Sequence, residues 1–155
     1  MKHTLQKAAV IGMAAMTLFA FAACGEKQEL VLDPSAAADT LLNEITFDTE
    51  LADAGEAAAG ILFTLPEGVT AAVYAGDGAY ADELVIFDCG SRENVAAAQE
   101  AAEAHLADLK ESFADYIPEE AEKVDSAVME TAGSYLILCV SDDENAAAAV
   151  QAVLK

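Results

Sequence analysis

Basic side chains are scarce in this chain of 155 residues. It has 7 lysines and arginines against 28 aspartates and glutamates, which gives a formal net charge of −21 at pH 7. A surface of this sign repels nucleic-acid phosphates and anionic lipid headgroups, so we expect no nucleic-acid partner. The acidity predicts a solvated surface that keeps the protein soluble, although it could also attract cations or a basic partner.

Histidine and cysteine are also rare. The histidines are His3 and His105, and the cysteines are Cys24, Cys89 and Cys139. A Ser/His/acid triad or a cysteine nucleophile would have to use His105, which lies in a predicted helix with no nucleophile motif beside it. No spacing of histidines, cysteines and acids fits a closed zinc site. The sequence therefore predicts no catalytic residue, no metal site and no cofactor.

Two short acidic clusters invite a metal-binding interpretation. Asp77, Asp82 and Glu83 surround a glycine-rich turn that could bind calcium loosely, but no loop has the acidic spacing of an EF-hand, which favours an ordinary hairpin turn. Asp142-Asp143-Glu144 opens the last predicted helix, where acids complement the helix dipole without a metal. Gly76-Asp77-Gly78 joins two predicted strands and has no lysine, which argues against a phosphate-binding loop.

The N-terminal segment has the order of a secretory signal: charged, then apolar, then small residues. Lys2 and Lys7 precede an uncharged apolar run over residues 8–23. The run has 16 residues, whereas a membrane-spanning helix needs about 20. We therefore expect a signal peptide and not a permanent span.

Ala22-Ala23-Cys24 resembles the lipobox of bacterial lipoproteins, in which the cysteine is diacylglycerated and becomes the mature N-terminus. Phe21 stands where that motif usually has leucine. Two or more acyl chains anchor a protein firmly, whereas one chain binds only marginally. We expect residues 1–23 to be the signal peptide, Cys24 to carry the lipid, and residues 24–34 to form a tether. This would place the protein on the extracytoplasmic face of the cell membrane.

Residues 35–155 are predicted to form a single α+β domain. The clearest element is a helix between Ser91, its predicted cap, and Pro118, which should stop it. Its apolar stripe recurs at spacings of three and four, through Val95, Ala98, Ala102, Leu106, Leu109, Phe113 and Tyr116. Further helices are expected over about 35–45, capped by Ser35, and about 142–154, and strands over 70–75, 82–89, 123–129 and 135–140.

The last two-thirds of the chain repeats one pattern. Leu84–Phe87 is followed by a capping serine, Glu93-Asn94 and alanines, and Leu136–Leu138 by a capping aspartate, Glu144-Asn145 and alanines. Duplicated β-β-α units of this kind predict a four-stranded, antiparallel sheet with helices packed on one face, plus an N-terminal helix.

The repeat also bears on the two remaining cysteines. An even pair in an exported protein invites a disulfide. However, the shared register puts Cys89 on the core side of its strand and Cys139 on the opposite side, because adjacent strand positions face opposite sides. The two thiols would then be unable to bridge without distortion, and we expect both to be reduced and partly buried.

Three segments resemble a known family. Residues 81–87 (ADELVIF), 111–120 (ESFADYIPEE) and 133–141 (GSYLILCVS) are similar to the small Gram-positive lipoproteins grouped as domain of unknown function 4358. The resemblance covers roughly residues 36–154, and Phe63-Thr64-Leu65 departs from the aromatic-glycine step of that family. It implies a lipoprotein and carries over no site residues, because the family has no established activity.

These observations favour a non-enzymatic binding or accessory module that is tethered at the membrane. Its partner would be an envelope protein or a small ligand. An enzyme subunit that borrows residues from a partner and a structural component of the cell envelope are the alternatives.

Overall fold

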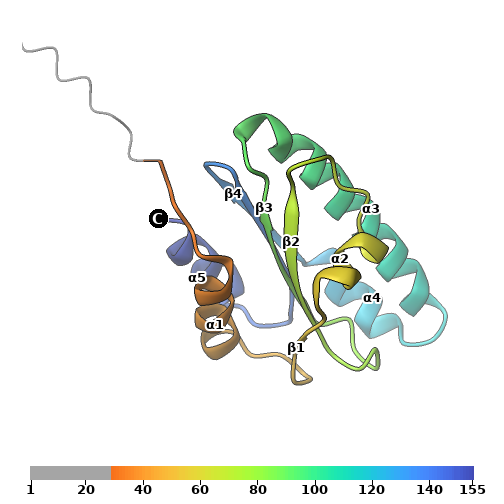
Figure 1. The fold of residues 1–155 in the computed structure, drawn as a ribbon. Helices are drawn as coiled ribbons and strands as arrows, with labels where there is room; N and C mark the ends of the chain where they lie inside the picture. Colours follow the sequence, from red (N-terminus) through yellow and green to blue (C-terminus); the bar gives the residue numbers. More distant parts are fainter. Residues whose placement is uncertain (1–28) are drawn as a thin grey trace, which may run out of the picture.

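The computed structural model of the protein describes residues 29–155 (Figure 1). The predicted signal peptide and Cys24 lie outside the described residues. Within residues 29–155, no helix is long and apolar enough to cross a membrane. The elements in chain order are α1 Pro34–Glu44, β1 Ala52–Asp53, α2 Glu56–Leu62, β2 Thr70–Ala75, β3 Glu83–Asp88, a 3₁₀ turn Arg92–Asn94, α3 Val95–Ala114, α4 Pro118–Asp125, β4 Val128–Ala132, β5 Tyr135–Val140 and α5 Ala146–Val153.

One antiparallel sheet of five strands lies at the centre, in the order β1-β2-β3-β5-β4. The two middle strands, β3 and β5, are almost entirely apolar and buried along their length. A strand that is apolar at every position must have both of its faces covered, because successive side chains point to opposite sides. The α+β class and the antiparallel sheet are therefore confirmed, and β1 adds a fifth strand to the four that were predicted.

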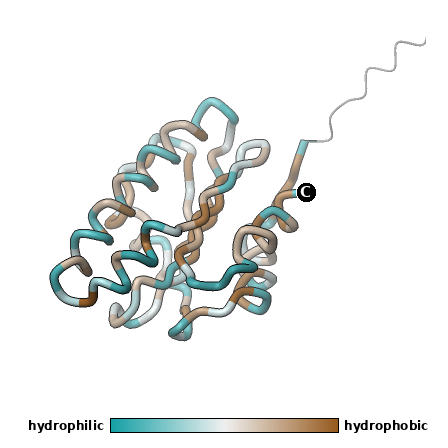
Figure 2. Tube along the Cα trace, turned by 180° about the vertical axis from the view of Figure 1, so that it is seen from behind, coloured by the Kyte–Doolittle hydropathy of each residue, from teal (hydrophilic) through white to brown (hydrophobic). Residues whose placement is uncertain are grey.

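Helices cover both faces of the sheet, so the prediction that they pack on one face is wrong. Figure 1 shows α1 and α5 on one side of the strands and α2, α3 and α4 on the other. The first layer packs on Leu84, Ile86 and Ile137, and the second on Val85 and Phe87. The hydropathy colouring of Figure 2 places the most apolar stretches on these middle strands, between the two layers.

The two hairpin–helix units are present, but they are not equivalent copies. The hairpin β2–β3 is followed by α3 and the hairpin β5–β4 is followed in sequence by α5, and these helices lie on opposite faces. Two equivalent units that meet in an antiparallel pair would place their helices on the same face. The chain after β5 instead turns toward α1, because Ser141 donates a hydrogen bond to the carbonyl of Thr46 (2.7 Å), just beyond α1.

Several element boundaries differ from the sequence-based expectations. Residues 123–125, predicted as strand, belong to α4, and Pro118 is the first residue of that helix as well as a barrier to α3. Tyr116 lies beyond α3 and is 76% exposed, so it is not part of the buried stripe. Asp33, not Ser35, caps α1, because its carboxylate accepts from the backbone N–H groups of Ser35 (2.9 Å) and Ala36 (3.2 Å).

Cys89 and Cys139 are both free thiols that are fully buried. Cys89 packs in the layer of α3, and Cys139 packs in the layer of α1 and α5. The prediction that they face opposite sides of the sheet is confirmed. The side of Cys139 is not solvent, however, since the second helix layer covers it.

Candidate functional site

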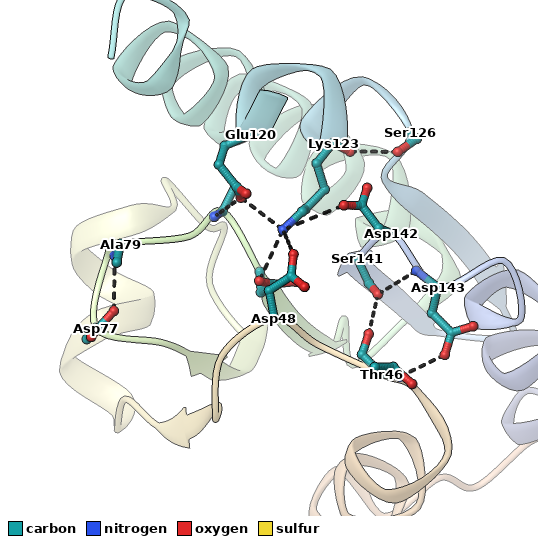
Figure 3. A network of polar contacts seen from close by, with 12 residues as sticks. Thr46, Asp48, Asp77, Ala79, Glu120, Lys123, Ser126, Ser141, Asp142 and Asp143 are labelled. Atoms are coloured by element: carbon teal, nitrogen blue, oxygen red, sulfur yellow. Dashed lines mark hydrogen bonds and ion pairs between the residues drawn. The ribbon is translucent and has the colours of Figure 1, made fainter. Parts of the chain in front are cut away.

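A buried lysine, Lys123 of α4, collects the most concentrated charge in the described part of the chain. Lys123 is 2% exposed. Its ammonium nitrogen lies 2.7 Å from a carboxylate oxygen of Asp48, 2.9 Å from one of Glu120 and 3.2 Å from one of Asp82. A fourth carboxylate, that of Asp142, is 3.9 Å away. Figure 3 shows the carboxylates of Asp48, Glu120 and Asp142 converging on the lysine from different segments.

The sequence positions this cluster at one end of the sheet. Glu120 and Lys123 are three residues apart in α4 and therefore share one side of the helix. Asp82 immediately precedes β3, and Asp142 follows β5. Because these two strands are antiparallel neighbours, the start of β3 and the end of β5 lie side by side. The remaining acid, Asp48, comes from the loop after α1, so the cluster joins both helix layers around the end of the sheet.

Burial and ion pairing act in opposite directions on Lys123. Burial alone would lower the pKa of its ammonium, but the hydrogen bonds to Asp48 and Glu120 and the charge of Asp82 raise it well above its usual value. Burial raises the pKa of the Asp82 carboxyl, and Lys123 opposes that rise. Oδ1 of Asp82 is buried and has no hydrogen-bond partner among residues 29–155.

Chemically, this cluster is an internal ion network whose cation is the lysine itself. The ammonium occupies the space between the carboxylates, and Tyr80 places its ring 5.5 Å from the same nitrogen. Glu120 also accepts from the backbone N–H of Ala81 (2.7 Å), which fixes the segment leading into β3. Among residues 29–155, no group of histidines, cysteines and acids is placed to hold a metal ion. The arrangement is suited to linking segments of the fold.

His105 and Glu83 form a second buried polar pair. Nε2 of His105 lies 2.9 and 3.0 Å from the two carboxylate oxygens of Glu83, and the Phe63 ring packs against the imidazole at a centroid distance of 4.8 Å. A carboxylate can orient a histidine for base catalysis. Here, however, no serine or cysteine of the described residues hydrogen-bonds to the ring, so the pair bridges β3 and α3 beneath α2.

The residues of the predicted acidic turn do not share one site. Asp77 accepts from the backbone N–H of Ala79 (3.0 Å), as in an ordinary turn. Asp82 turns inward to Lys123 and Glu83 to His105. The sequence identified these acids and the lone His105 as candidates but gave no partner for either.

The acids after β5 also differ from expectation, because α5 begins only at Ala146 and has no acid in its first turn. The carboxylate of Asp143 accepts from the backbone N–H of Thr46 (2.8 Å) and of Asn145 (2.8 Å). These hydrogen bonds lower the pKa of the Asp143 carboxyl below its usual range. Asp143 therefore joins the chain after α1 to the start of α5, and it does not act through the helix dipole.

Sequence reasoning missed Lys123, Asp48 and Glu120. One available signal was Lys123 itself. Only four lysines and arginines fall within residues 29–155, and this one lies on the same side of a short helix as its buried apolar residues. The other was the spacing of Glu120 and Lys123, which is typical of an ion pair on a helix.

A groove of about 600 Å³, lined mostly by apolar residues, lies between α2 and the start of β2, and its lining includes Phe63, whose ring packs against His105. Among its lining residues, the only charged side chain is that of Glu56. It is lined by Glu56, Ala59, Gly60, Phe63, Thr64, Leu65, Val69, Thr70 and Ala71. Ile61 of α2, beside the groove, is 82% exposed. This groove is the concave surface of the described domain that best fits an external ligand.

Comparison with known proteins gives one match. No curated protein and no solved structure matches the chain. Residues 67–141 match the sequence model of a family described as a domain of unknown function (DUF4358). That segment contains Lys123, Asp82 and Glu120 as well as the His105–Glu83 pair. Through residues 67–141, the chain belongs to this domain family.

Proposed function

We propose that the protein is an extracytoplasmic lipoprotein, anchored through Cys24, whose domain is a non-enzymatic binding or accessory module. The observation that carries the anchor is the sequence around Cys24: a basic start, a 16-residue apolar run and a small-residue step before a cysteine. The observation that carries the binding role is the apolar groove beside α2, which is open at the surface.

The start of the described chain supports this arrangement. Leu30 lies against Gly133 in the turn between β4 and β5, where a Cβ on Gly133 would be 3.6 Å from the Leu30 side chain. Glu29, Leu30, Val31 and the C-terminal Lys155 lie together, and Figure 1 shows the start of the described chain and the C-terminus on the α5 side of the molecule. The described part of the tether therefore begins beside the turn between β4 and β5, at the β4 edge of the sheet.

A lipid on Cys24 would hold that edge close to the membrane. Five residue steps separate Cys24 from Glu29, and a fully extended chain spans at most about 3.5 Å per residue, or about 17 Å in all. The groove lies at β2, on the opposite side of the sheet order from β4. It would thus lie three strand positions away from the tether, where a partner can reach it.

Membrane fractionation tests the anchor. We expect the full chain, expressed in a bacterium that lipidates such precursors, to sediment with membranes and to be released by detergent but not by high salt. A Cys24→Ala chain should lose this behaviour, and a Cys139→Ala chain should keep it. Sedimentation that is unchanged by Cys24→Ala would contradict the proposal.

A second candidate function, an enzyme subunit, draws on the His105–Glu83 pair. A buried histidine held by a carboxylate has two of the three parts of a nucleophile-activating triad. The third part would have to come from a partner protein. A His105→Gln chain that keeps every activity later assigned to the complex would remove this alternative.

A further inference from the structure

The sheet has one edge that is only half paired. β1 is a two-residue strand, and it pairs with Ala75 and Tyr74 at the end of β2. One further hydrogen bond runs from the N–H of Ala54 to the carbonyl of Val73 (2.9 Å). Beyond that bond the chain leaves the sheet at Gly55, whose φ of 77° turns it into α2.

Ala71 is therefore left on an open edge. In an antiparallel strand, the N–H and C=O of one residue point to the same side, and residues two apart share that side. Since the carbonyl of Val73 points toward β1, both backbone groups of Ala71 point the same way. Among residues 29–155 no partner strand reaches them, because the pairing with the β1 segment stops at the hydrogen bond between Ala54 and Val73, two residues before Ala71.

The groove is continuous with this open edge. Thr70 and Ala71 line it on one side, and Phe63 and Leu65 form apolar contacts for a side chain that enters it. Strand addition uses two features, unpaired backbone groups at a sheet edge and an adjoining apolar pocket. The main-chain hydrogen bonds give affinity, and the pocket receives alternate side chains of the added strand.

The opposite edge of the sheet is protected, and this one is not. β4 carries Glu130 at its centre, held at 2.9 Å by Gln151 of α5. Charged residues within an edge strand disfavour the addition of another strand. The part of β2 beyond the hydrogen bond between Ala54 and Val73, residues 70–72, has no charged side chain.

The charge of the protein limits what can bind here. Among the described residues, the only charged side chain that lines the groove is that of Glu56, and Asp53 and Glu67 lie on the exposed segments at either end of α2 and its loop. The full chain has a net charge of −21, so the protein attracts a basic segment and repels an acidic one.

We propose that the groove between α2 and β2 binds an extended, basic peptide segment of a partner protein, which adds to the open edge of β2 as a further strand. This inference deepens the proposed binding role and rests on it. Alternate apolar side chains of the peptide enter the groove, and its backbone pairs with both hydrogen-bonding groups of Ala71.

A labelled probe peptide tests the proposal on the full-length chain in detergent. The probe is a heptapeptide of alternating valine and threonine with a lysine at each end, and binding is measured by fluorescence anisotropy. We expect saturable binding that weakens as salt is added and that is lost when glutamates replace the two lysines. Equal binding of the lysine and glutamate peptides would overturn the charge argument and with it the proposal.

Two substitutions at Ala71 isolate the backbone contact. Ala71→Pro removes the N–H from the open edge, where proline is tolerated in a sheet, and should weaken binding by about tenfold. Ala71→Ser keeps the N–H and a similar side-chain size. Its affinity for the peptide should therefore stay within about twofold of that of the parent chain, a smaller change than a tenfold loss, which corresponds to about 1.4 kcal/mol. Equal affinities of these two variants would contradict strand addition.

Gly60 offers a second test that leaves the sheet untouched. A Cβ at Gly60 meets no atom within 4 Å, so Gly60→Leu can extend into the groove without displacing the core. We expect Gly60→Leu to compete with the peptide and Gly60→Ala to leave binding nearly unchanged. Gly60→Leu with undiminished binding would place the peptide elsewhere.

Amide hydrogen exchange needs no variant. Peptide addition should slow exchange at the Ala71 N–H and leave β4 unaffected. Protection of residues 128–132 instead would overturn the proposal even if the peptide binds. Lipid on Cys24 is measured separately, so a lipidated chain without protection at Ala71 refutes this inference and leaves the anchor standing.

Discussion

At the scale of single residues, Lys123 is the side chain on which most buried charge depends. Its ammonium is held by carboxylates from the loop after α1, from the start of β3 and from α4 itself. Two of these acids, Asp82 and Glu120, are themselves buried. Removing one partner of a buried ion cluster lowers the free energy of unfolding by more than the intact cluster contributes to it, because unpaired charges stay behind in the interior.

We therefore predict that Lys123→Met destabilises the domain by about 3–5 kcal/mol, measured as the free energy of unfolding in urea. The matched control is Lys110→Met, whose ammonium pairs with Asp125 at the surface. An exposed pair contributes only about 0–1 kcal/mol. Equal effects of the two substitutions would show that the buried network carries no special share of the stability.

Cys139 makes stability depend on alkaline pH. Burial, with smaller contributions from Asp82 and Asp143, raises the pKa of its thiol from 9.0 to about 12. The thiol therefore ionises first in the unfolded chain, so its contribution to stability is complete below pH 9 and falls as the pH rises toward about 12. We expect the free energy of unfolding to fall by up to about 1.4 kcal/mol per pH unit from this group.

A Cys139→Ala chain provides the comparison between pH 8 and 10.5. It should be less stable throughout because it leaves a cavity, but its stability should decline less steeply with pH. Burial also raises the pKa of the Cys89 thiol, and this contribution to the pH dependence of stability is present in both chains. Parallel slopes for the two chains would contradict the burial argument for Cys139.

At the scale of elements, the start of α1 shows how a cap is decided by geometry. Both Asp33 and Ser35 are residue types that cap helices. Asp33 has the extended backbone of a cap and accepts two backbone hydrogen bonds, while Ser35 already lies in the first turn behind Pro34. Proline is favoured at the first helical position, and this places the cap one residue before it.

Asp33→Ala should therefore cost about 1 kcal/mol of unfolding free energy, the usual effect of losing a side-chain cap. Ser35→Ala, at the position that the sequence favoured, should change it by less than about 0.5 kcal/mol, as for an ordinary surface substitution. Thermal unfolding of the two variants under one set of conditions measures the difference. A larger loss for Ser35→Ala would reverse the assignment of the cap.

The elements that sequence predicted best are those with one dominant local signal. β2 and β5 have the predicted bounds, because each is an apolar run between turn residues. α4 was missed because its apolar residues are few and Pro118 was interpreted only as an end to α3. The network around Lys123 could not be predicted, because its acids come from segments whose proximity is set by the tertiary fold.

The layer arrangement was wrong for a related reason. The continuous apolar runs of β3 and β5 do indicate strands covered on both faces. The repeat of hairpin and helix outweighed that signal and suggested one helix layer. The side taken by α5 is decided by Ser141 and Asp143, which bind Thr46 beyond α1, and such a contact has no signature in the sequence.

At the scale of the whole molecule, the proposed anchor and the groove lie at opposite ends of the strand order. The described chain begins beside Gly133 and the β4 edge, and the groove lies along β2. A lipid at Cys24 would therefore present the open edge of β2 to the space beyond the membrane. The strong negative charge would keep the domain from lying flat on anionic lipid.

Intact mass spectrometry of the protein recovered from bacterial membranes tests this account most directly. It predicts a mature chain that begins at Cys24 and carries a diacylglyceryl group on the thiol. A chain that begins at another residue, or that begins at Cys24 with a free thiol and appears in the soluble fraction, would contradict it.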